Sequence, residues 1–300
     1  MPHQHRRCDT QPIEATRPFA TLTFPIHRAN ITSMPDLRIG TSAFTATGWE
    51  NAFYPAGMKA ADYLTYYATK FHTVEVDSTF YRTPSVATVN GWARKVPAGF
   101  LLAAKVPQLI THEKILRDCE TDLKNFLETM DLMGEKLGPL LFQFGYFNKS
   151  AFKSDKEFLA RLEPFLKKLP QGYKFALEIR NKQWLTAQFF DLLREHKVAY
   201  ALIDQAWMPR VSEIFQKFDP ITADFTYIRL LGDRKGIEQK TKIWDKVIVD
   251  RSKELMSWVN VCQRTIRRGV STYVYVNNHY AGFAPATVEQ FQKLWKTAAR

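Results

Sequence analysis

Cysteine is scarce and long apolar runs are missing in this 300-residue chain. Its three cysteines, Cys8, Cys119 and Cys262, are odd in number and widely spaced, which favours a reducing compartment over a disulfide framework. No run of about 18 apolar residues occurs, so the sequence predicts no membrane contact. The stretch 18–26 is too short and too interrupted by proline for a signal peptide. We therefore expect a cytoplasmic protein.

Two kinds of motif are also absent. Neither G-x-G-x-x-G nor G-x-x-x-x-G-K-[ST] occurs, and no repeat of solenoid length is visible. These absences argue against a doubly wound nucleotide-binding sheet and against a repeat protein. The chain instead has 45% apolar and 14% aromatic residues, enough to bury a large core. A chain of this size can form a single domain if it is a barrel.

The N-terminal residues differ in composition from the rest. Residues 1–35 hold scattered histidines and prolines without a sustained apolar period, so we predict a disordered N-terminal extension there. Met34 offers an alternative start just before the first apolar run. We expect one folded domain over residues 36–300.

From Leu37 onward, short apolar runs alternate with amphipathic stretches. We predict buried parallel strands at Arg38–Thr41, Thr73–Val76, Phe100–Lys105, Leu140–Phe142, Lys174–Leu177, Ala199–Ile203, Tyr227–Leu230 and Tyr273–Val276. We predict helices at Ala60–Lys70, Val86–Lys95, Cys119–Lys136, Asp155–Lys168, Ala187–His196, Arg251–Arg268 and Ala286–Thr297, with residues 205–226 mostly irregular. Eight strands in this alternation predict an α/β fold, the (β/α)8 TIM barrel.

Polar side chains gather where the predicted strands end. In a barrel these ends surround the active-site mouth. Seven of the eight strands finish in polar or charged residues. A charge buried there without a partner would destabilise the folded state by several kcal/mol. The strand-end residues are Glu75, Asp77, Lys105 with His112 on the next loop, Gln143, Glu178, Arg180, Asp204, Arg229, Asn277, Asn278 and His279.

Spacing places several of these side chains inside the barrel. Glu75 and Asp77 lie two residues apart, as do Glu178 and Arg180, so each pair projects to one side of its strand. The alternative for both pairs is simple neutralisation by a neighbouring opposite charge. Lys105 admits three roles: a Schiff-base amine, a phosphate anchor, or a counter-ion to Glu75.

Two histidines, His112 and His279, lie on predicted mouth loops and can serve as acid and base near neutral pH. They are too few for a histidine-rich dinuclear zinc centre, and we predict no metal site. A hard cation remains an alternative. Its ligands would be Glu75, Asp77, Glu178 and Asp204.

Cations and neutral amides indicate what the mouth binds. Lys105, Arg180 and Arg229 come from alternate strands, and we expect an anion against at least Arg229 and one of the other two. The alternative is that carboxylates already neutralise all three. Asn277 and Asn278 suit hydroxyl or carbonyl groups. Four aromatic residues on these loops suit stacking on a sugar or base: Trp49, Tyr81, Trp184 and Tyr280.

Four motifs resemble the YecE-like family, a domain of unknown function. They are residues 73–84 (TVEVDSTFYRTP), 105–112 (KVPQLITH), 177–184 (LEIRNKQW) and 275–285 (YVNNHYAGFAP). The resemblance covers residues 37–298 and implies a TIM barrel. The family-like positions are Glu75, Thr79, Tyr81, Lys105, His112, Gln143, Glu178, Arg180, Trp184, Arg229, Asn277 and Asn278. The chain departs from the family pattern at Ala43, Asp77, Gly145 and Leu231.

These residues together predict an enzyme that acts on a small polar, anionic or sugar-like substrate by acid/base chemistry, as a hydrolase or an isomerase. The catalytic candidates are Glu75, Asp77, Lys105, His112, Glu178 and Asp204. The substrate-binding candidates are Tyr81, Gln143, Arg180, Trp184, Arg229, Asn277, Asn278 and His279. Two alternatives stay open: a barrel that binds a ligand without turnover, and a nucleic-acid-binding or nucleic-acid-processing protein, which the net charge of +12 favours. No cofactor follows from the sequence.

Overall fold

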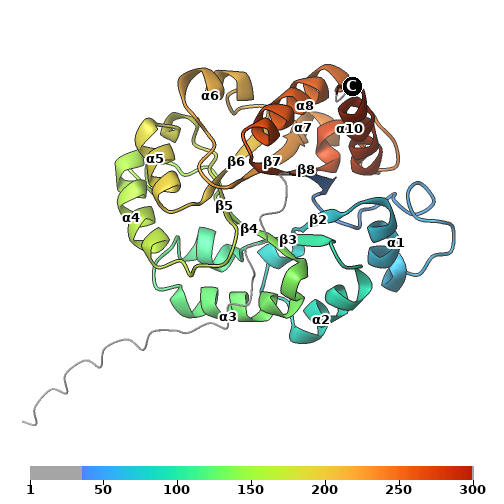
Figure 1. The fold of residues 1–300 in the computed structure, drawn as a ribbon, viewed down its shortest axis with the longest axis horizontal. Coiled ribbons are helices and arrows are strands. Elements are labelled where there is room, and N and C mark those ends of the chain that lie inside the picture. Colours follow the sequence, from blue (N-terminus) through green and yellow to red (C-terminus); the bar gives the residue numbers. More distant parts are fainter. Residues whose placement is uncertain (1–35, 299–300) are drawn as a thin grey trace, which may run out of the picture. The chain divides into compact units, whose positions relative to one another are not determined.

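Eight parallel strands form a nearly closed barrel in the computed structural model, which describes residues 36–298 (Figure 1). The strands are β1 (Leu37–Thr41), β2 (Thr73–Val76), β3 (Leu101–Lys105), β4 (Leu137–Gln143), β5 (Phe175–Glu178), β6 (Ala199–Gln205), β7 (Phe225–Gly232) and β8 (Ser271–Val276). Their hydrogen-bonded order is β1-β8-β7-β6-β5-β4-β3-β2. All carboxyl ends therefore meet at one end of the barrel, as the predicted TIM barrel requires.

Helices surround the strands in chain order (Figure 1). They are α1 (Tyr63–Lys70), α2 (Val86–Lys95), α3 (Glu120–Met130), α4 (Asp155–Lys167), α5 (Ala187–Glu195), α6 (Val211–Lys217), α7 (Arg234–Glu238), α8 (Ser252–Arg267), α9 (Asn278–Ala281) and α10 (Ala284–Ala298). Ser85, Ser154 and Thr186 begin α2, α4 and α5, because each hydroxyl accepts a hydrogen bond from a backbone N–H of the first turn. Within residues 36–298 no helix is long and apolar enough to cross a membrane.

The predicted elements correspond to observed ones with small changes at their ends. The segment 205–226, expected to be mostly irregular, contains the short helix α6 between Pro209 and Pro220. The stretch predicted as one helix from Cys119 to Lys136 is α3 followed by a 3-10 segment, which Gly134 interrupts with a positive φ of 56°. The predicted N-terminal extension lies outside the described residues.

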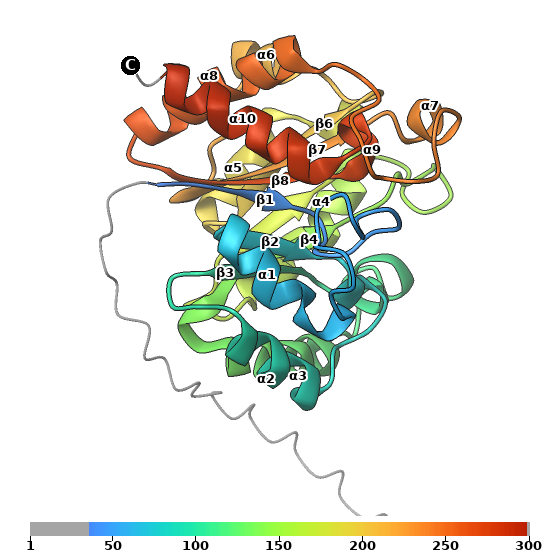
Figure 2. The same ribbon diagram turned by 90° about the vertical axis from the view of Figure 1, so that its right-hand side faces the viewer.

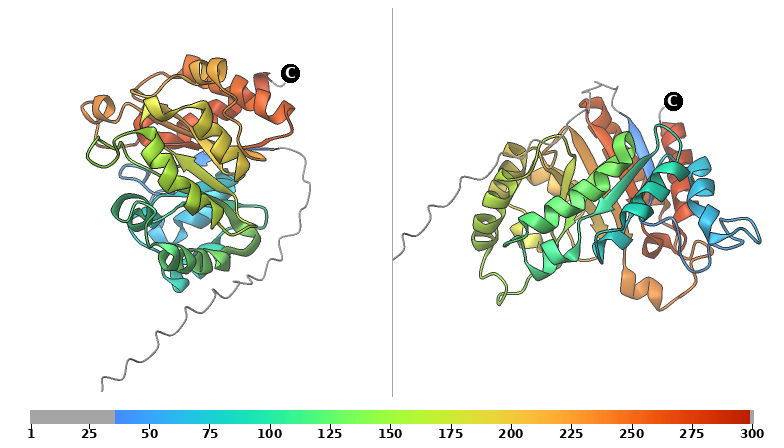
Figure 3. Two further views of the ribbon diagram at one scale, coloured as in Figure 1. Left: turned by 90° about the vertical axis from the view of Figure 1, so that its left-hand side faces the viewer. Right: turned by 90° about the horizontal axis from the view of Figure 1, so that it is seen from below.

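The barrel interior is filled unevenly. Strands β7 and β8 contribute the aromatic residues Phe225, Tyr227, Tyr273 and Tyr275, while alanines from β3, β5 and β6 face them. Large side chains from one side thus fill the space left by small ones on the other. Figure 3 shows the yellow-green helices α4 and α5 covering the outside of the strands in its left-hand view. The polar site lies above this packed layer.

One seam of the barrel is closed by a side chain. No backbone ladder joins β1 to β2 within the described residues, but the Tyr67 hydroxyl of α1 accepts from the Thr41 N–H at 2.9 Å and contacts the Thr73 carbonyl oxygen at 3.1 Å. Figure 2 shows α1 in front of β2, with β1 just above it in that view. Gly40 permits the close approach, because a Cβ there would lie 2.0 Å from the Thr73 oxygen.

Candidate functional site

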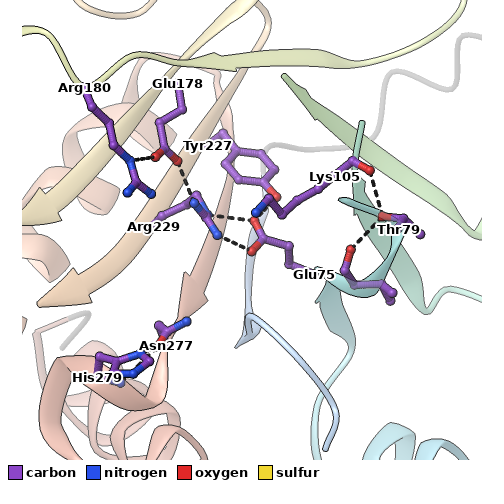
Figure 4. A network of polar contacts seen from close by, with 10 residues as sticks. Glu75, Thr79, Lys105, Glu178, Arg180, Tyr227, Arg229, Asn277 and His279 are labelled. Carbon is purple, nitrogen blue, oxygen red and sulfur yellow. Dashed lines mark hydrogen bonds and ion pairs between the residues drawn. The ribbon is translucent and has the colours of Figure 1, made fainter. Parts of the chain in front are cut away.

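Arg229 on β7 joins two buried carboxylates across the barrel (Figure 4). Its Nε and Nη2 donate to Glu75 on β2 at 2.9 and 2.7 Å, and its Nη1 donates to Glu178 on β5 at 2.6 Å. Both carboxylates are 0% exposed and Arg229 is 3% exposed. Charges buried to this degree are stable only when each is paired and hydrogen-bonded, and this geometry meets that condition.

Two further donors complete this cluster. Tyr227 donates its hydroxyl to Glu75 at 2.6 Å, and Arg180 donates its Nε to Glu178 at 2.9 Å. Burial opposes ionisation of Glu178, but Arg229 and Arg180 outweigh it and hold the pKa of Glu178 below its usual value. We call Glu75, Glu178, Arg180 and Arg229 the clamp. Its two negative and two positive charges balance.

The clamp changes which arginine is available to an anion. The three guanidinium nitrogens of Arg229 all bond to carboxylates, so the expected anion contact at Arg229 does not fit this geometry. Arg180 differs, because its side chain is 23% exposed and its two terminal nitrogens have no partner among residues 36–298. The predicted neutralisation therefore applies to Arg229, and Arg180 keeps free donors at the mouth.

Lys105, at the end of β3, stands beside the clamp without joining it. Its Nζ lies 4.0 Å from the centroid of the Phe80 ring, and in the described part of the chain it has no hydrogen-bond or ion-pair partner. Figure 4 shows its side chain running toward Glu75, whose oxygens are already bonded. Burial, followed by the charge of Arg229, lowers the pKa of Lys105 to about 8. The Thr79 hydroxyl fixes this strand end by donating to the Lys105 carbonyl at 2.7 Å.

Asp77 connects the clamp region to a small pocket. It is partly buried, and burial followed by the charge of Glu75 raises the pKa of its carboxyl group. The pocket has a volume of about 180 Å³ at the ends of β1 and β8, and Asp77 and Ser42 line it. The Ser42 hydroxyl is buried and has no hydrogen-bond partner among residues 36–298. A cavity of about 150 Å³ holds a molecule the size of benzene, so this pocket suits a small ligand or one end of a larger one.

The predicted amides line the same pocket. The Asn277 oxygen accepts from the backbone N–H of His279 at 3.0 Å and contacts its Nδ1 at 2.5 Å. The Asn278 oxygen accepts from the Trp49 indole at 3.2 Å and the Ala284 N–H at 2.9 Å. Because these contacts fix both amide oxygens, each NH2 group is left to donate elsewhere. The pocket thus offers two amide donors and a hydroxyl.

The two predicted histidines occupy different sides of the mouth. His112 lies on the π-helical turn 109–113, with its ring edge-on to Phe80 at 5.0 Å. Burial, followed by the charge of Lys105, lowers the pKa of His112. His279 lies 2.9 Å from a carboxylate oxygen of Glu238; burial lowers the pKa of His279, while this contact acts in the opposite direction. Only His112 is a neighbour of Lys105.

Asp204 and Gln143 are separate from the pocket. The Asp204 carboxylate accepts from the Trp258 indole at 2.7 Å and the Tyr280 hydroxyl at 3.1 Å. It lines a second pocket, of about 820 Å³, with residues of α6 and α8. Gln143 is 7% exposed and pairs in register with Glu178, so it lies at the clamp.

Most of the aromatic residues expected at the mouth are buried. Trp49, Trp184 and Tyr280 are 1%, 5% and 1% exposed, and Trp184 stacks against Phe158 at 5.1 Å. The expectation that Trp184 binds substrate is therefore not supported, because packing already covers its ring. Tyr81 is 71% exposed and remains available. Two exposed aromatic residues not singled out from the sequence lie on the loops after β4 and β6: Tyr146 and Trp207.

The alternative of a hard cation finds no support in the donor arrangement. Glu75 and Glu178 bond to Arg229, and Asp204 bonds to an indole and a phenol. Across residues 36–298, no group of three His, Cys, Asp or Glu side chains is arranged to hold a metal ion.

The model of the family described as a protein of unknown function, DUF72, matches residues 38–300. The chain belongs to the DUF72 family. It is 29% identical over 118 residues to the UPF0759 protein YecE of Escherichia coli, a match that covers 39% of this chain and 41% of YecE. It is 28% identical over 153 residues to the UPF0759 protein YunF of Bacillus subtilis, covering 48% of this chain and 52% of YunF. These matches span about half or less of each relative.

The fold is shared with solved members of the same family. A crystal structure of a DUF72 family protein from Thermotoga maritima superposes with a TM-score of 0.65 at 25% identity, covering 88% of this chain and 99% of that one. A second, from Enterococcus faecalis, gives a TM-score of 0.62 at 20% identity, covering 87% and 98%. Both the predicted TIM barrel and the predicted family are thus confirmed.

Proposed function

We propose that this DUF72 protein is an enzyme that acts on a small polar substrate at the carboxyl end of the barrel by proton transfer. One observation carries the proposal: the clamp is balanced in itself, and Lys105 and Asp77 are left beside it without ion-pair partners in the described residues. In a purely structural network, each of these charged groups would form an ion pair. Groups kept unpaired at a barrel mouth are typical of acid/base sites.

Each group has a role in the proposed reaction. The neutral fraction of the Lys105 amine accepts a proton, because burial lowers the pKa of Lys105 to about 8 and so raises that fraction near neutral pH. The Asp77 carboxyl group donates one, because burial and Glu75 favour its protonated form. His112 packs against the same Phe80 ring as Lys105 and is a second base, with a lowered pKa. The clamp fixes β2, the strand that ends just before Asp77.

Substrate recognition uses the remaining free donors. The terminal nitrogens of Arg180 suit a phosphate or carboxylate group, which a guanidinium binds through two parallel hydrogen bonds. The pocket of Ser42, Asn277 and Asn278 suits hydroxyl or carbonyl oxygens. A hydroxylated anion, such as a sugar phosphate or a hydroxy acid, satisfies both.

The test measures binding and turnover with the same compounds. Inorganic phosphate, sugar phosphates and hydroxy acids are added to the full-length protein, with chloride at equal ionic strength as reference. We expect anion-specific thermal stabilisation that is lost in Arg180→Met and kept in Arg268→Met, which removes an exposed arginine paired with Asp219. We also expect deuterium exchange into, or conversion of, a stabilising compound in D2O, followed by NMR. Stabilisation without exchange or conversion would favour a non-catalytic ligand-binding barrel, and no stabilisation would reject an anionic substrate.

A further inference from the structure

The Lys105 amine has an unusual environment that proton transfer alone does not require. The residue is 8% exposed, and its Nζ faces the Phe80 ring at 4.0 Å with no oxygen partner in the described chain. Lysine ammonium groups are strongly hydrated and are almost never buried unpaired. Burial without a partner destabilises the ammonium form and so increases the fraction of neutral amine, in which the nitrogen lone pair is free to react.

A counter-ion role does not explain this placement. Both oxygens of Glu75 accept from Arg229, and Tyr227 adds a third hydrogen bond. Glu178 is likewise bonded by Arg229 and Arg180. The clamp needs no fifth charged group.

We propose that the side-chain amine of Lys105 forms an imine with a small hydroxylated aldehyde or ketone, an inference that rests on the enzyme function proposed above. The nitrogen lone pair attacks the carbonyl carbon, a C–N bond forms, and a proton moves from nitrogen to the carbonyl oxygen. The Asp77 carboxyl group then protonates the resulting hydroxyl, and the C–O bond breaks to release water. The products are an iminium ion, the Asp77 carboxylate and water, with no change in oxidation state.

The surroundings define the class of carbonyl compound. Asp77 interacts electrostatically with Lys105 and also lines the pocket that holds Ser42, Asn277 and Asn278. A substrate whose carbonyl carbon is at the amine can therefore place its hydroxyl groups against these donors. The pocket volume of about 180 Å³ favours a short carbon chain.

The experiment traps the imine by reduction. Full-length protein is incubated with glycolaldehyde or dihydroxyacetone and sodium cyanoborohydride, and peptide mass mapping locates the adducts. Reduction adds the mass of the carbonyl compound less one oxygen atom. At pH 7 a lysine with a pKa of about 8 has roughly a hundredfold more neutral amine than an ordinary lysine. We therefore expect labelling of Lys105 to be about tenfold or more faster than labelling of Lys174, which lies at the opposite end of the barrel before β5.

The pH profile and the variants decide the outcome. Labelling of Lys105 should level off above pH about 8. Lys105→Met should remove the fast adduct and Lys174→Met should not. Labelling of Lys105 no faster than that of Lys174 would overturn the imine. If anion stabilisation and deuterium exchange persist in that case, the proposed acid/base function stands. A fast Lys105 adduct in a protein that shows neither anion stabilisation nor exchange would support imine formation and reject the proposed turnover.

Discussion

At Arg229, burial and charge oppose each other. Moving a guanidinium and two carboxylates out of water costs several kcal/mol per ion, and only close pairing offsets this cost. Arg229 provides that pairing with three hydrogen bonds of 2.6 to 2.9 Å, while Arg180 donates a further one to Glu178 and Tyr227 one to Glu75. Burial disfavours the charge of Arg229, but Glu75 and Glu178 hold its pKa above the usual value. Glu178, predicted from the sequence as a catalytic candidate, thus also has a structural role.

Replacing Arg229 by methionine should destabilise the protein strongly. The change leaves Glu75 and Glu178 fully buried without their main partner, which costs about 3–5 kcal/mol of unfolding free energy. Urea unfolding measures this loss. The matched control is Arg268→Met, which breaks an exposed pair with Asp219 and should cost less than about 1 kcal/mol. Equal losses in the two variants would show that the clamp does not support the fold.

Lys105 predicts a pH dependence of stability with a definite sign. The unfolded chain keeps the lysine proton up to pH about 10.4, whereas the folded chain loses it at about 8. Between these values unfolding takes up a proton, so the stability contributed by Lys105 rises with pH. Urea unfolding of wild type and Lys105→Met should therefore show the wild type gaining relative to the variant from pH 8 to pH 10. A difference independent of pH would contradict the lowered pKa of Lys105.

The spacing of residues on strands predicted most of the clamp. Glu75, Glu178, Arg180 and Arg229 were all found from their positions at strand ends. Tyr227 was missed, although it lies two residues before Arg229 and therefore on the same strand face. The same rule, applied backward along the strand, identifies it.

Other site features have no signal in the sequence. The Ser42 hydroxyl is notable because it is buried without a partner in the part of the chain that the structure describes, and that depends on where the neighbouring chain segments pack. The same holds for Trp184, whose sequence position on a mouth loop does not reveal that Phe158 covers its ring. Whether a loop aromatic faces solvent or the core is decided by tertiary packing.

Among the elements, the alternation of strands and helices determined the fold, whereas their ends were less well predicted. Strand β4 extends from Leu137 to Gln143, beyond the predicted Leu140–Phe142, because the register between β3 and β4 shifts at Gly138 and Pro139 and this irregularity accommodates a proline that has no N–H to donate. The helix α6 was missed because it has only seven residues, too few to show a helical period.

The seam between β1 and β2 should depend on a single hydroxyl. Tyr67→Phe removes the contacts to the Thr41 N–H and the Thr73 carbonyl while leaving the ring packed, so we expect a loss of about 1–3 kcal/mol. Hydrogen exchange at the Thr41 amide should also become faster. Tyr63→Phe is the control, because the Tyr63 hydroxyl on the same helix has no hydrogen-bond partner among residues 36–298. Unchanged exchange at Thr41 would mean that backbone contacts hold the seam.

For the whole molecule, the clamp joins strands far apart in the chain. Glu75, Glu178 and Arg229 come from β2, β5 and β7, and the hydrogen bonds between them cross the barrel rather than follow the sheet. The interior aromatic residues of β7 and β8 fill the layer beneath. The clamp therefore requires β2, β5 and β7 to be in place together.

Residues 1–33 should be dispensable for this body. The first strand begins at Leu37, and β1 is the part that pairs with β8, so deletion of residues 1–33 removes no element of the barrel. The deletion removes four arginines and two acidic residues, which leaves a net charge of +10. We expect the melting temperature to change by no more than a few degrees and the phosphate stabilisation to persist. A second deletion, of residues 1–41, removes β1 and should abolish cooperative unfolding. If the shorter deletion also lowers the melting temperature by about ten degrees or more, the N-terminal residues contribute to the fold and the predicted domain boundary is wrong.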